Sequence, residues 1–301
     1  MKTLHQAALC AALLLCLSAC GPANTDDVKE LKASTDKDSA SAQFILGERY
    51  ANGDGVDKND AEAVTWYAKA AEQGHVEAQC RLGKHYHDGD RVDKEEAVKW
   101  FKKAAWQGHA EAQYRLACCY ATGLGADVDV AQAVKWLMKA AEQGHAEAQA
   151  SLGSCYLNGT GVAKDAAEAV KWYTKAAEQG VAEAQYSLGN CYRYGYSVDE
   201  DAAEAVKWYR KAAEQGHAWA QYSLGGCYLI GEGVAEDTAE AIKWYKKAAE
   251  QGHAWAQCSL GGCYHYGRVV RKDTAEAVKW YTKAAEQGDA QARKALKEIT
   301  K

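Results

Sequence analysis

Apolar and polar positions recur together about every 36 residues through most of this sequence. Seven tryptophans mark the recurrence, 34 residues apart once and then 36 apart five times: Trp66, Trp100, Trp136, Trp172, Trp208, Trp244 and Trp280. Within the unit over residues 182–216, the pattern predicts one helix over 182–194 and a second that begins at Asp201. Such a period is typical of a helical solenoid, in which each unit buries its apolar face against its neighbours. A tryptophan at the same place in the second helix of every unit is expected to pack against neighbouring helices.

Residues with special capping or backbone properties mark the ends of the two helices. The glycine-bearing stretch "YGYSVDE" over 194–200 ends the first helix. The carboxylate of Asp201 caps the second helix, and Glu204 three residues later completes a capping box. Gly216 suits the left-handed turn that follows a helix. The connection that precedes Trp100 is two residues short, so the early loops are expected to differ. The acidic pairing recurs as Asp165 with Glu168, Asp237 with Glu240 and Asp273 with Glu276.

The first helix of each unit has one constant face and one variable face. At about 100° per residue, the positions that stay apolar or small from copy to copy share one face; in the unit after residue 217 they are Ala220, Leu224, Cys227 and Tyr228. The positions that differ between copies lie opposite: Trp219, Tyr222, Gly226, Leu229 and Ile230. Packing against a neighbour demands the same shape in every copy, whereas a surface that meets a ligand is free to vary.

The repeated segments "AEAQYSLGNCYRYG" (182–195) and "DAAEAVKWYRKAAEQG" (201–216) resemble the Sel-one-like repeat family, which is related to tetratricopeptide repeats. They recur seven times, with a truncated eighth helix over 290–299. The resemblance implies an all-α, right-handed αα-solenoid over residues 39–301 with a C-terminal capping helix. It also implies a protein-binding scaffold in which the variable face of each first helix lines the concave side.

Trp219 and Trp255 stand where earlier copies have a glutamate, as in the "AEAQ" segments at 110–113, 146–149 and 182–185. Because neighbouring helices lie about 8–10 Å apart, the two indoles are expected to be neighbours. The predicted partner-binding groove comprises Tyr186, Tyr194, Trp219, Tyr222, Trp255, His265 and Tyr266. At the inner face of the earlier repeats the sequence has Glu77, Lys84, His87, Asp88, Glu111 and Glu147 instead. The alternative is that both indoles fold over the preceding helix and extend the core.

Two further series of residues, the cysteines and the histidines, are of types that often form disulfides, metal sites or catalytic sites. Both recur with the period of the repeat, which spreads them along the array instead of gathering them in one site. Five cysteines recur at intervals of 36, namely Cys119, Cys155, Cys191, Cys227 and Cys263. Equivalent helices stand too far apart for these to bond to each other, so they are expected to be small buried side chains. A bridge from Cys80 to Cys118 or Cys119 stays open. Five histidines, at 75, 109, 145, 217 and 253, are spread along the array rather than converging on a metal. We therefore predict no metal, no cofactor and no catalytic residue.

The N-terminus suggests an envelope protein. Residues 1–19 fit a signal peptide, because Lys2 precedes an apolar run that is too short to span a bilayer. The segment Leu17-Ser18-Ala19-Cys20 resembles a bacterial lipobox, which implies a lipid on Cys20 and a flexible tether over 20–38. Since Gly21 is not aspartate, the resemblance favours the periplasmic side of the outer membrane over the inner membrane. A net charge of −5 disfavours a nucleic-acid partner.

The expected function is a lipid-anchored envelope scaffold that binds a protein or an extended peptide. A peptidoglycan- or glycan-binding protein is the alternative, with the aromatic rings stacked on sugar faces. A β-lactam-binding hydrolase is less favoured, because no pairing of nucleophile and base is visible.

Overall fold

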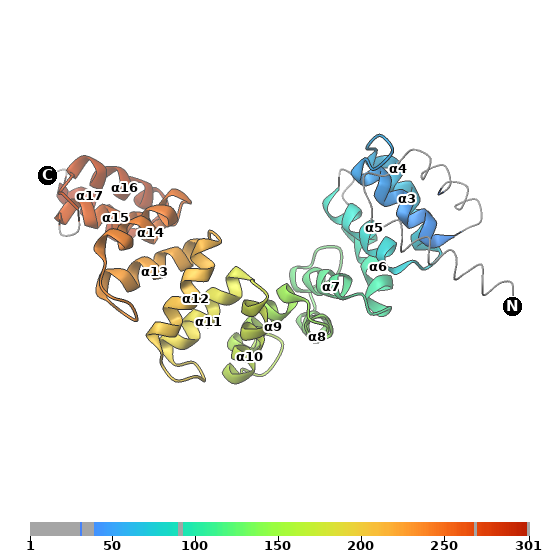
Figure 1. Ribbon diagram of the computed structural model, residues 1–301, viewed down its shortest axis with the longest axis horizontal. Helices are drawn as coiled ribbons and strands as arrows, with labels where there is room; N and C mark the ends of the chain where they lie inside the picture. The colour runs from blue at the N-terminus through green and yellow to red at the C-terminus, as the bar shows by residue number, and fades with distance from the viewer. Residues whose placement is uncertain (1–30, 32–38, 90–92, 268–269, 300–301) are drawn as a thin grey trace. The chain divides into compact units, whose positions relative to one another are not determined.

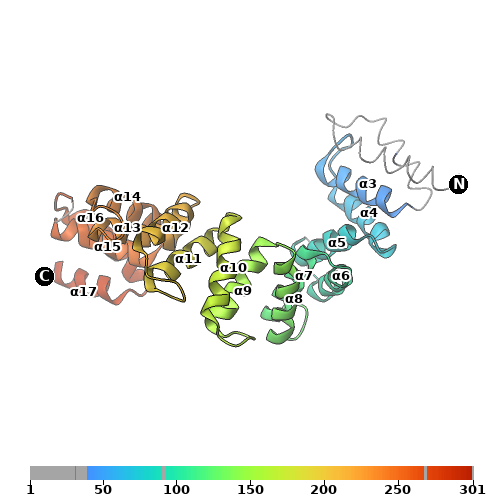
Figure 2. The same ribbon diagram turned by 60° about the horizontal axis from the view of Figure 1, so that its bottom comes forward.

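The structure, a computed structural model, describes residues 31, 39–89, 93–267 and 270–299, and within them it contains fifteen helices and no strand. The chain divides into two compact units, with the boundary in the sequence between Asp129 and Val130. In each unit the helices follow one another side by side in chain order (Figures 1 and 2). The predicted all-α solenoid is confirmed.

The first unit contains α3 (Ala40–Asn52), α4 (Asp60–Glu72), α5 (Val76–Asp88), α6 (Lys94–Trp106) and α7 (Ala110–Thr122). The second unit contains α8 (Val130–Glu142), α9 (Ala146–Asn158), α10 (Ala166–Glu178), α11 (Ala182–Tyr194), α12 (Ala202–Glu214), α13 (Ala218–Ile230), α14 (Thr238–Glu250), α15 (Ala254–Tyr266), α16 (Thr274–Glu286) and α17 (Ala290–Ile299).

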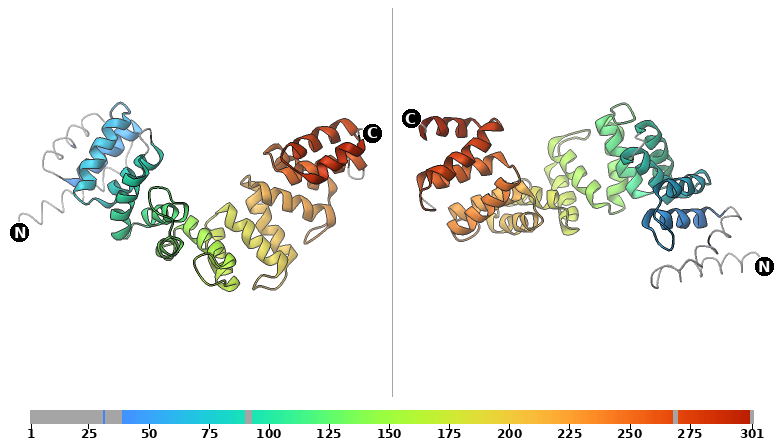
Figure 3. Two further views of the ribbon diagram at one scale, coloured as in Figure 1. Left: turned by 180° about the vertical axis from the view of Figure 1, so that it is seen from behind. Right: turned by 90° about the horizontal axis from the view of Figure 1, so that it is seen from above.

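Each repeat consists of two thirteen-residue helices, and within each unit the second helix of one repeat packs on the first helix of the next. In the second unit, α11 packs against α12 and α13 against α14, as the two views of Figure 3 show. The predicted bounds of the helix over 182–194 and the truncated eighth helix over 290–299 are confirmed by α11 and α17.

In six of the seven repeats, a glycine of the first helix faces a large ring of the second, the third repeat being the exception. A Cβ atom added to Gly189 would lie 2.7 Å from the Tyr209 ring, and one added to Gly225 would lie 2.8 Å from the Tyr245 ring. Tyr209 is completely buried. The absence of a Cβ thus lets the two helices approach closely enough for the ring to fill the space between them.

A ladder of glutamines, which the sequence reading did not identify, joins consecutive repeats. The side chain of Gln221 is 4% exposed, and its Nε2 donates to the Ala213 carbonyl oxygen at 3.0 Å. Its Oε1 accepts from Nε2 of Gln251 at 2.8 Å. Equivalent buried glutamines stand at positions 43, 79, 113, 149, 185 and 257. These hydrogen bonds satisfy the buried amides, and around Gln221 they tie α13 to the ends of α12 and α14.

The helix caps predicted from the sequence are confirmed in part. Asp201 caps α12, because its Oδ1 accepts from the Glu204 amide at 2.9 Å, and Gly216 has a φ of 91° as expected. The full capping box is wrong. The Asp201 amide donates instead to the Tyr192 carbonyl oxygen at 2.9 Å, and the Glu204 carboxylate pairs with Lys207 at 2.7 Å. An ion pair three residues along the helix thus replaces the reciprocal bond.

The recurring tryptophans are packing residues, as predicted. Trp100, Trp136, Trp244 and Trp280 are between 5% and 7% exposed, and the other three are half-buried. In every repeat, the ammonium of the lysine three residues later lies over the indole, at 3.7 to 4.8 Å from the ring centroid. The lysine covers the outer face of the indole with a cation–π contact.

The cysteines of the described residues carry free thiols, Cys80, Cys118 and Cys119 among them. Burial raises the pKa of Cys191 and of Cys227 to about 11, so these thiols stay protonated and unreactive at neutral pH. The prediction of small buried side chains is confirmed for Cys119, Cys191 and Cys227, whereas Cys155 and Cys263 are partly exposed.

The predicted signal peptide over 1–19 and the lipidation residue Cys20 lie outside the described residues. Within the predicted tether over 20–38, only Leu31 is described. It is helical and 8% exposed, and it packs with Ala42 and Leu46 of α3.

Candidate functional site

Two tryptophans form an exposed pair on the second unit. Trp219 and Trp255 are the second residues of α13 and α15, and their side chains are 43% and 53% exposed. Their ring centroids lie 5.0 Å apart at an interplanar angle of 84°. The indoles are therefore neighbours, as the 36-residue spacing predicts. They do not lie buried within the core, as the alternative required.

A tyrosine and a histidine complete this group. The Tyr222 ring stacks on the His253 imidazole at 5.0 Å, and it lies 6.1 Å from the Trp255 ring. The imidazole also contacts Trp219 at 4.3 Å in a perpendicular arrangement. We refer to Trp219, Tyr222, His253 and Trp255 as the aromatic cluster.

The position of His253 follows from its role as the N-cap of α15. Its Nδ1 accepts from the Ala256 amide at 3.2 Å, so the neutral ring carries its proton on Nε2. The other recurring histidines cap their helices in the same way, which makes the prediction of loop residues before each first helix correct. The cap holds the imidazole in a fixed orientation beside the indoles.

His253 differs from His109 and His217 in the group that its Nε2 contacts. In the preceding repeat, Nε2 of His217 lies 2.9 Å from a carboxylate oxygen of Glu183, and His109 makes the same contact with Glu77 at 2.7 Å. Trp219 occupies the place of that glutamate for His253. Nε2 of His253 is buried and has no hydrogen-bond partner. Burial lowers the pKa of His253, so the ring is neutral at pH 7.

The two tryptophan substitutions also change the charge at the helix N-termini. The first turns of α5, α7, α9 and α11 each contain one glutamate, whereas those of α13 and α15 contain no acidic residue. A helix N-terminus carries a partial positive charge that an acidic side chain normally offsets. The aromatic cluster therefore lies beside two helix ends without such a charge.

The structure does not gather all seven predicted groove residues. Tyr186 is half-buried one repeat earlier, where it stacks on His217 at 5.0 Å. Tyr194 contacts Tyr196 at the C-terminal end of α11, and His265 contacts Tyr266 at the end of α15. Trp255 and Tyr266 are eleven residues apart, which corresponds to about 16 Å along a helix. Sharing a helix face does not bring residues together when they lie at opposite ends of it.

The charged face predicted for the earlier repeats is a network of ion pairs in the first unit. Arg115 lies 2.8 Å from Glu111 and 3.5 Å from Asp88, and Lys84 lies 3.7 Å from the same Glu111. These partly exposed pairs neutralise one another, so this surface offers no uncompensated charge comparable with the two helix ends beside the aromatic cluster.

Two exposed aromatic residues are not among those predicted from the sequence. Trp106, at the end of α6, is 73% exposed, and it replaces the glutamate of the "AEQG" segment. Tyr196 is 45% exposed in the loop after α11. The signal for Trp106 was the same as for Trp219, a tryptophan in place of a repeated glutamate.

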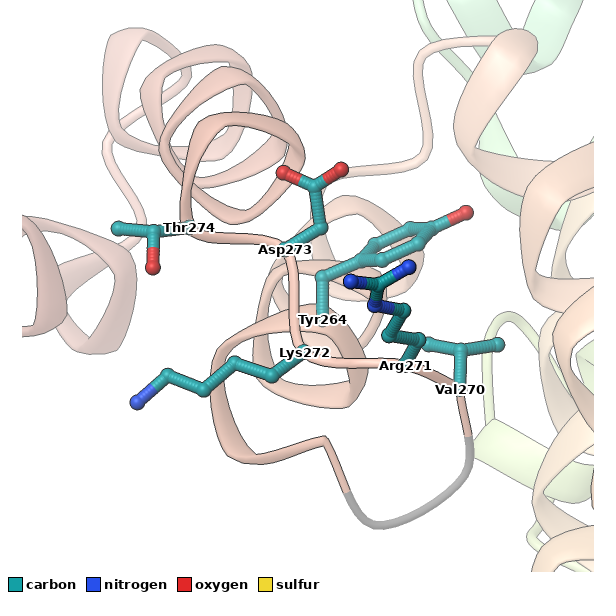
Figure 4. A pocket seen from close by; sticks show the side chains of 6 residues that line it. All are labelled: Tyr264, Val270, Arg271, Lys272, Asp273 and Thr274. Carbon is teal, nitrogen blue, oxygen red and sulfur yellow. The ribbon is translucent and has the colours of Figure 1, made fainter.

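No group of three metal-ligating side chains occurs among the residues that the structure describes. A pocket of about 540 Å³ beside the loop between α15 and α16 is lined by Tyr264, Val270, Arg271, Lys272, Asp273 and Thr274 (Figure 4). Its Asp273 caps α16 and its Tyr264 packs in the core. Over the described part of the chain, no helix is long and apolar enough to cross a membrane.

Comparison with known proteins identifies the family. The Sel1 repeat model matches seven consecutive segments, at residues 40–75, 76–109, 110–145, 146–181, 182–217, 220–253 and 256–289. The chain belongs to the Sel1 repeat family. Proteins of this family are generally scaffolds for protein–protein interaction, and repeat folds of this kind are typically non-catalytic.

Two solved structures show the likeness in detail. A protective antigen present in uropathogenic Escherichia coli strains, with an SLR fold, is 38% identical, with a TM-score of 0.81. The match covers 90% of this chain and 59% of that protein, so the chain corresponds to about three fifths of its length. A Sel1 repeat protein from Oxalobacter formigenes is 35% identical with a TM-score of 0.70, over 91% of this chain and 80% of the other. No curated protein matched the sequence.

Proposed function

We propose that this protein is an envelope scaffold that binds a protein partner through the aromatic cluster of its sixth and seventh repeats. One observation carries the proposal, namely the pair of half-exposed indoles at positions where earlier repeats have glutamate. A fold maintained by identical packing in every copy does not need these two substitutions. An exposed aromatic group beside polar residues is typical of the residues that dominate protein interfaces.

The geometry favours tight binding because much of the cluster is already ordered. Trp219 and Trp255 are fixed on helices, and they contact each other and His253. Binding therefore loses little side-chain entropy at Trp255, and the remaining exposed area of both indoles is available for burial.

The same geometry favours a protein over a sugar. The indoles of Trp219 and Trp255 stand at 84° to each other, so they present a corner rather than a flat platform. A corner of two rings suits an apolar side chain, whereas a sugar ring stacks on one aromatic face. Glycan binding is therefore the less favoured alternative.

Matched variants test this proposal. The purified chain, the Trp219→Glu/Trp255→Glu variant and the Trp106→Glu variant are used as baits for envelope extract and for purified peptidoglycan. We expect a protein retained by the unchanged chain and by Trp106→Glu but not by the double variant. Equal retention by all three would refute the assignment to the cluster, and retention of peptidoglycan that depends on the tryptophan pair would favour the glycan alternative.

The envelope location belongs to the same proposal and rests on the N-terminal sequence. Cleavage before Cys20 and lipidation of its thiol would anchor the scaffold, with the periplasmic side of the outer membrane as the expected place. Replacement of Cys20 by serine is expected to release the protein from the membrane fraction on cell fractionation. Continued sedimentation with membranes would contradict the lipid anchor.

A further inference from the structure

The unpartnered Nε2 of His253 indicates what the aromatic cluster binds. This atom is buried and carries the ring proton, because Nδ1 already accepts from the Ala256 amide at 3.2 Å. A buried donor without a partner is costly, and such groups in native proteins usually have an explanation. Here the repeat itself shows the missing partner, since His217 has Glu183 at 2.9 Å in the equivalent place.

We propose that the partner supplies this carboxylate: the cluster binds an aspartate or glutamate side chain of an extended peptide, next to an apolar side chain that packs on the indoles. The proposal rests on the proposed function. On binding, the indole of Trp219 turns aside from the imidazole, which it contacts at 4.3 Å, and the carboxylate accepts from Nε2 of His253. The apolar neighbour then fills the corner between Trp219 and Trp255.

Charge supports an anionic group at this place. The first turns of α13 and α15 lack the glutamate that the first turns of α5, α7, α9 and α11 contain. An incoming carboxylate would restore the charge that favours a helix N-terminus, and it would replace the intramolecular contact that Glu183 makes in the preceding repeat. A cationic or purely apolar segment would gain neither interaction.

The chain itself supplies the variants for the test. Trp219→Glu restores the glutamate found in earlier repeats and so fills the place of the ligand carboxylate from within. His253→Asp keeps the helix cap, because Asp289 caps α17 by accepting from the Ala292 amide at 2.8 Å, but it removes the donor. Trp106→Glu makes the same exchange of residues away from the cluster. Circular dichroism of each variant establishes that it is folded.

The experiment selects binders from a random peptide library displayed on phage, with the full chain as the immobilised target. The best binder is then synthesised with an amidated C-terminus, alongside a version in which its acidic residue is replaced by the corresponding amide. We expect selected peptides to share an acidic residue beside an apolar one. Loss of the carboxylate should weaken binding about 10- to 100-fold, the range for a hydrogen bond to a charged group.

The variants separate the two proposals. His253→Asp should weaken binding of the acidic peptide as much as the amide replacement does, and the two changes together should cost little more than either alone. Trp219→Glu should abolish binding and Trp106→Glu should leave it unchanged.

Peptides that need the tryptophans but tolerate both the amide replacement and His253→Asp would overturn the carboxylate inference and leave the proposal of protein binding intact. Binding that requires a free C-terminus would overturn the side-chain assignment, and selected peptides indifferent to Trp219 would overturn both proposals.

Discussion

Replacement by alanine should change the free energy of unfolding in opposite directions at two adjacent glycines of α13, Gly225 and Gly226. In the interior of an ordinary helix, Gly→Ala stabilises by about 0.8–1 kcal/mol, because alanine has the higher helix propensity. At Gly226 the nearest atom to an added Cβ is the Tyr245 hydroxyl oxygen at 3.6 Å, which is an ordinary contact. We therefore expect Gly226→Ala to raise the free energy of unfolding by about 0.8 kcal/mol.

At Gly225 the same methyl group has no room. It would lie 2.8 Å from Cδ1 of Tyr245 and 3.1 Å from the Ala241 carbonyl oxygen, and the second of these is backbone. Overpacking of this kind costs about 1–3 kcal/mol, which exceeds the gain in propensity. Gly225→Ala should therefore be destabilising by about 1 kcal/mol, and the two variants should differ by about 1–3 kcal/mol.

Urea unfolding followed by circular dichroism measures this difference as a shift in the midpoint at constant slope. A second change tests the cause. The third repeat carries Ala117 and Leu137 at the positions of the glycine and the ring. Tyr245→Leu should therefore make Gly225→Ala less damaging than it is alone. If both alanine variants stabilise equally, the close contact between glycine and ring does not limit packing.

Two smaller predictions follow from the backbone and from titration. Ser197 has a φ of 55°, where the equivalent positions have Gly161 and Gly233, so Ser197→Gly should raise the free energy of unfolding by about 0.5–1 kcal/mol; an unchanged or lower urea midpoint would contradict this. The pKa of His253 is lowered in the folded protein, mainly by burial, so its contribution to stability is complete above pH about 6.5 and declines as the pH falls through the folded pKa. His253→Asp should make stability fall less between pH 7 and pH 5, and an identical slope in urea titrations at a series of pH values would exclude this contribution.

Much of the fold could be predicted because the same packing and capping residues recur in every repeat. The recurring glycines and Asp201 mark helix ends, so the bounds of α11 were available from the sequence. The glutamine ladder was not, although Gln221 and Gln251 recur as regularly as the tryptophans. Periodicity shows that a position is constant, but it does not show that an amide reaches a carbonyl oxygen in another helix. Glu204 was misassigned for a similar reason, since only geometry decides between the backbone amide and Lys207.

The sequence was enough to predict the pair of tryptophans in the candidate site, but not which other residues lie beside them. Equal spacing was enough to make Trp219 and Trp255 neighbours. Tyr266 shares a helix face with Trp255 but lies near the other end of α15, and a shared face says nothing of distance along the helix axis. His253 was missed because its property depends on the absence of a glutamate from another helix. A comparison of the His217 and Glu183 pair with its counterpart would have shown this, once the two were known to touch.

The proposed recognition surface requires that the indoles of Trp219 and Trp255 lie outside the core, and unfolding of the Trp219→Glu/Trp255→Glu variant tests this directly. Since earlier repeats carry glutamate at these positions, its free energy of unfolding should stay within about 1 kcal/mol of that of the unchanged chain. Trp244→Ala, at a tryptophan that is 5% exposed, provides the reference for a core residue and should cost about 3–5 kcal/mol. A loss from the double variant as large as that from Trp244→Ala would mean that the pair stabilises the fold, and the proposed recognition surface would be wrong.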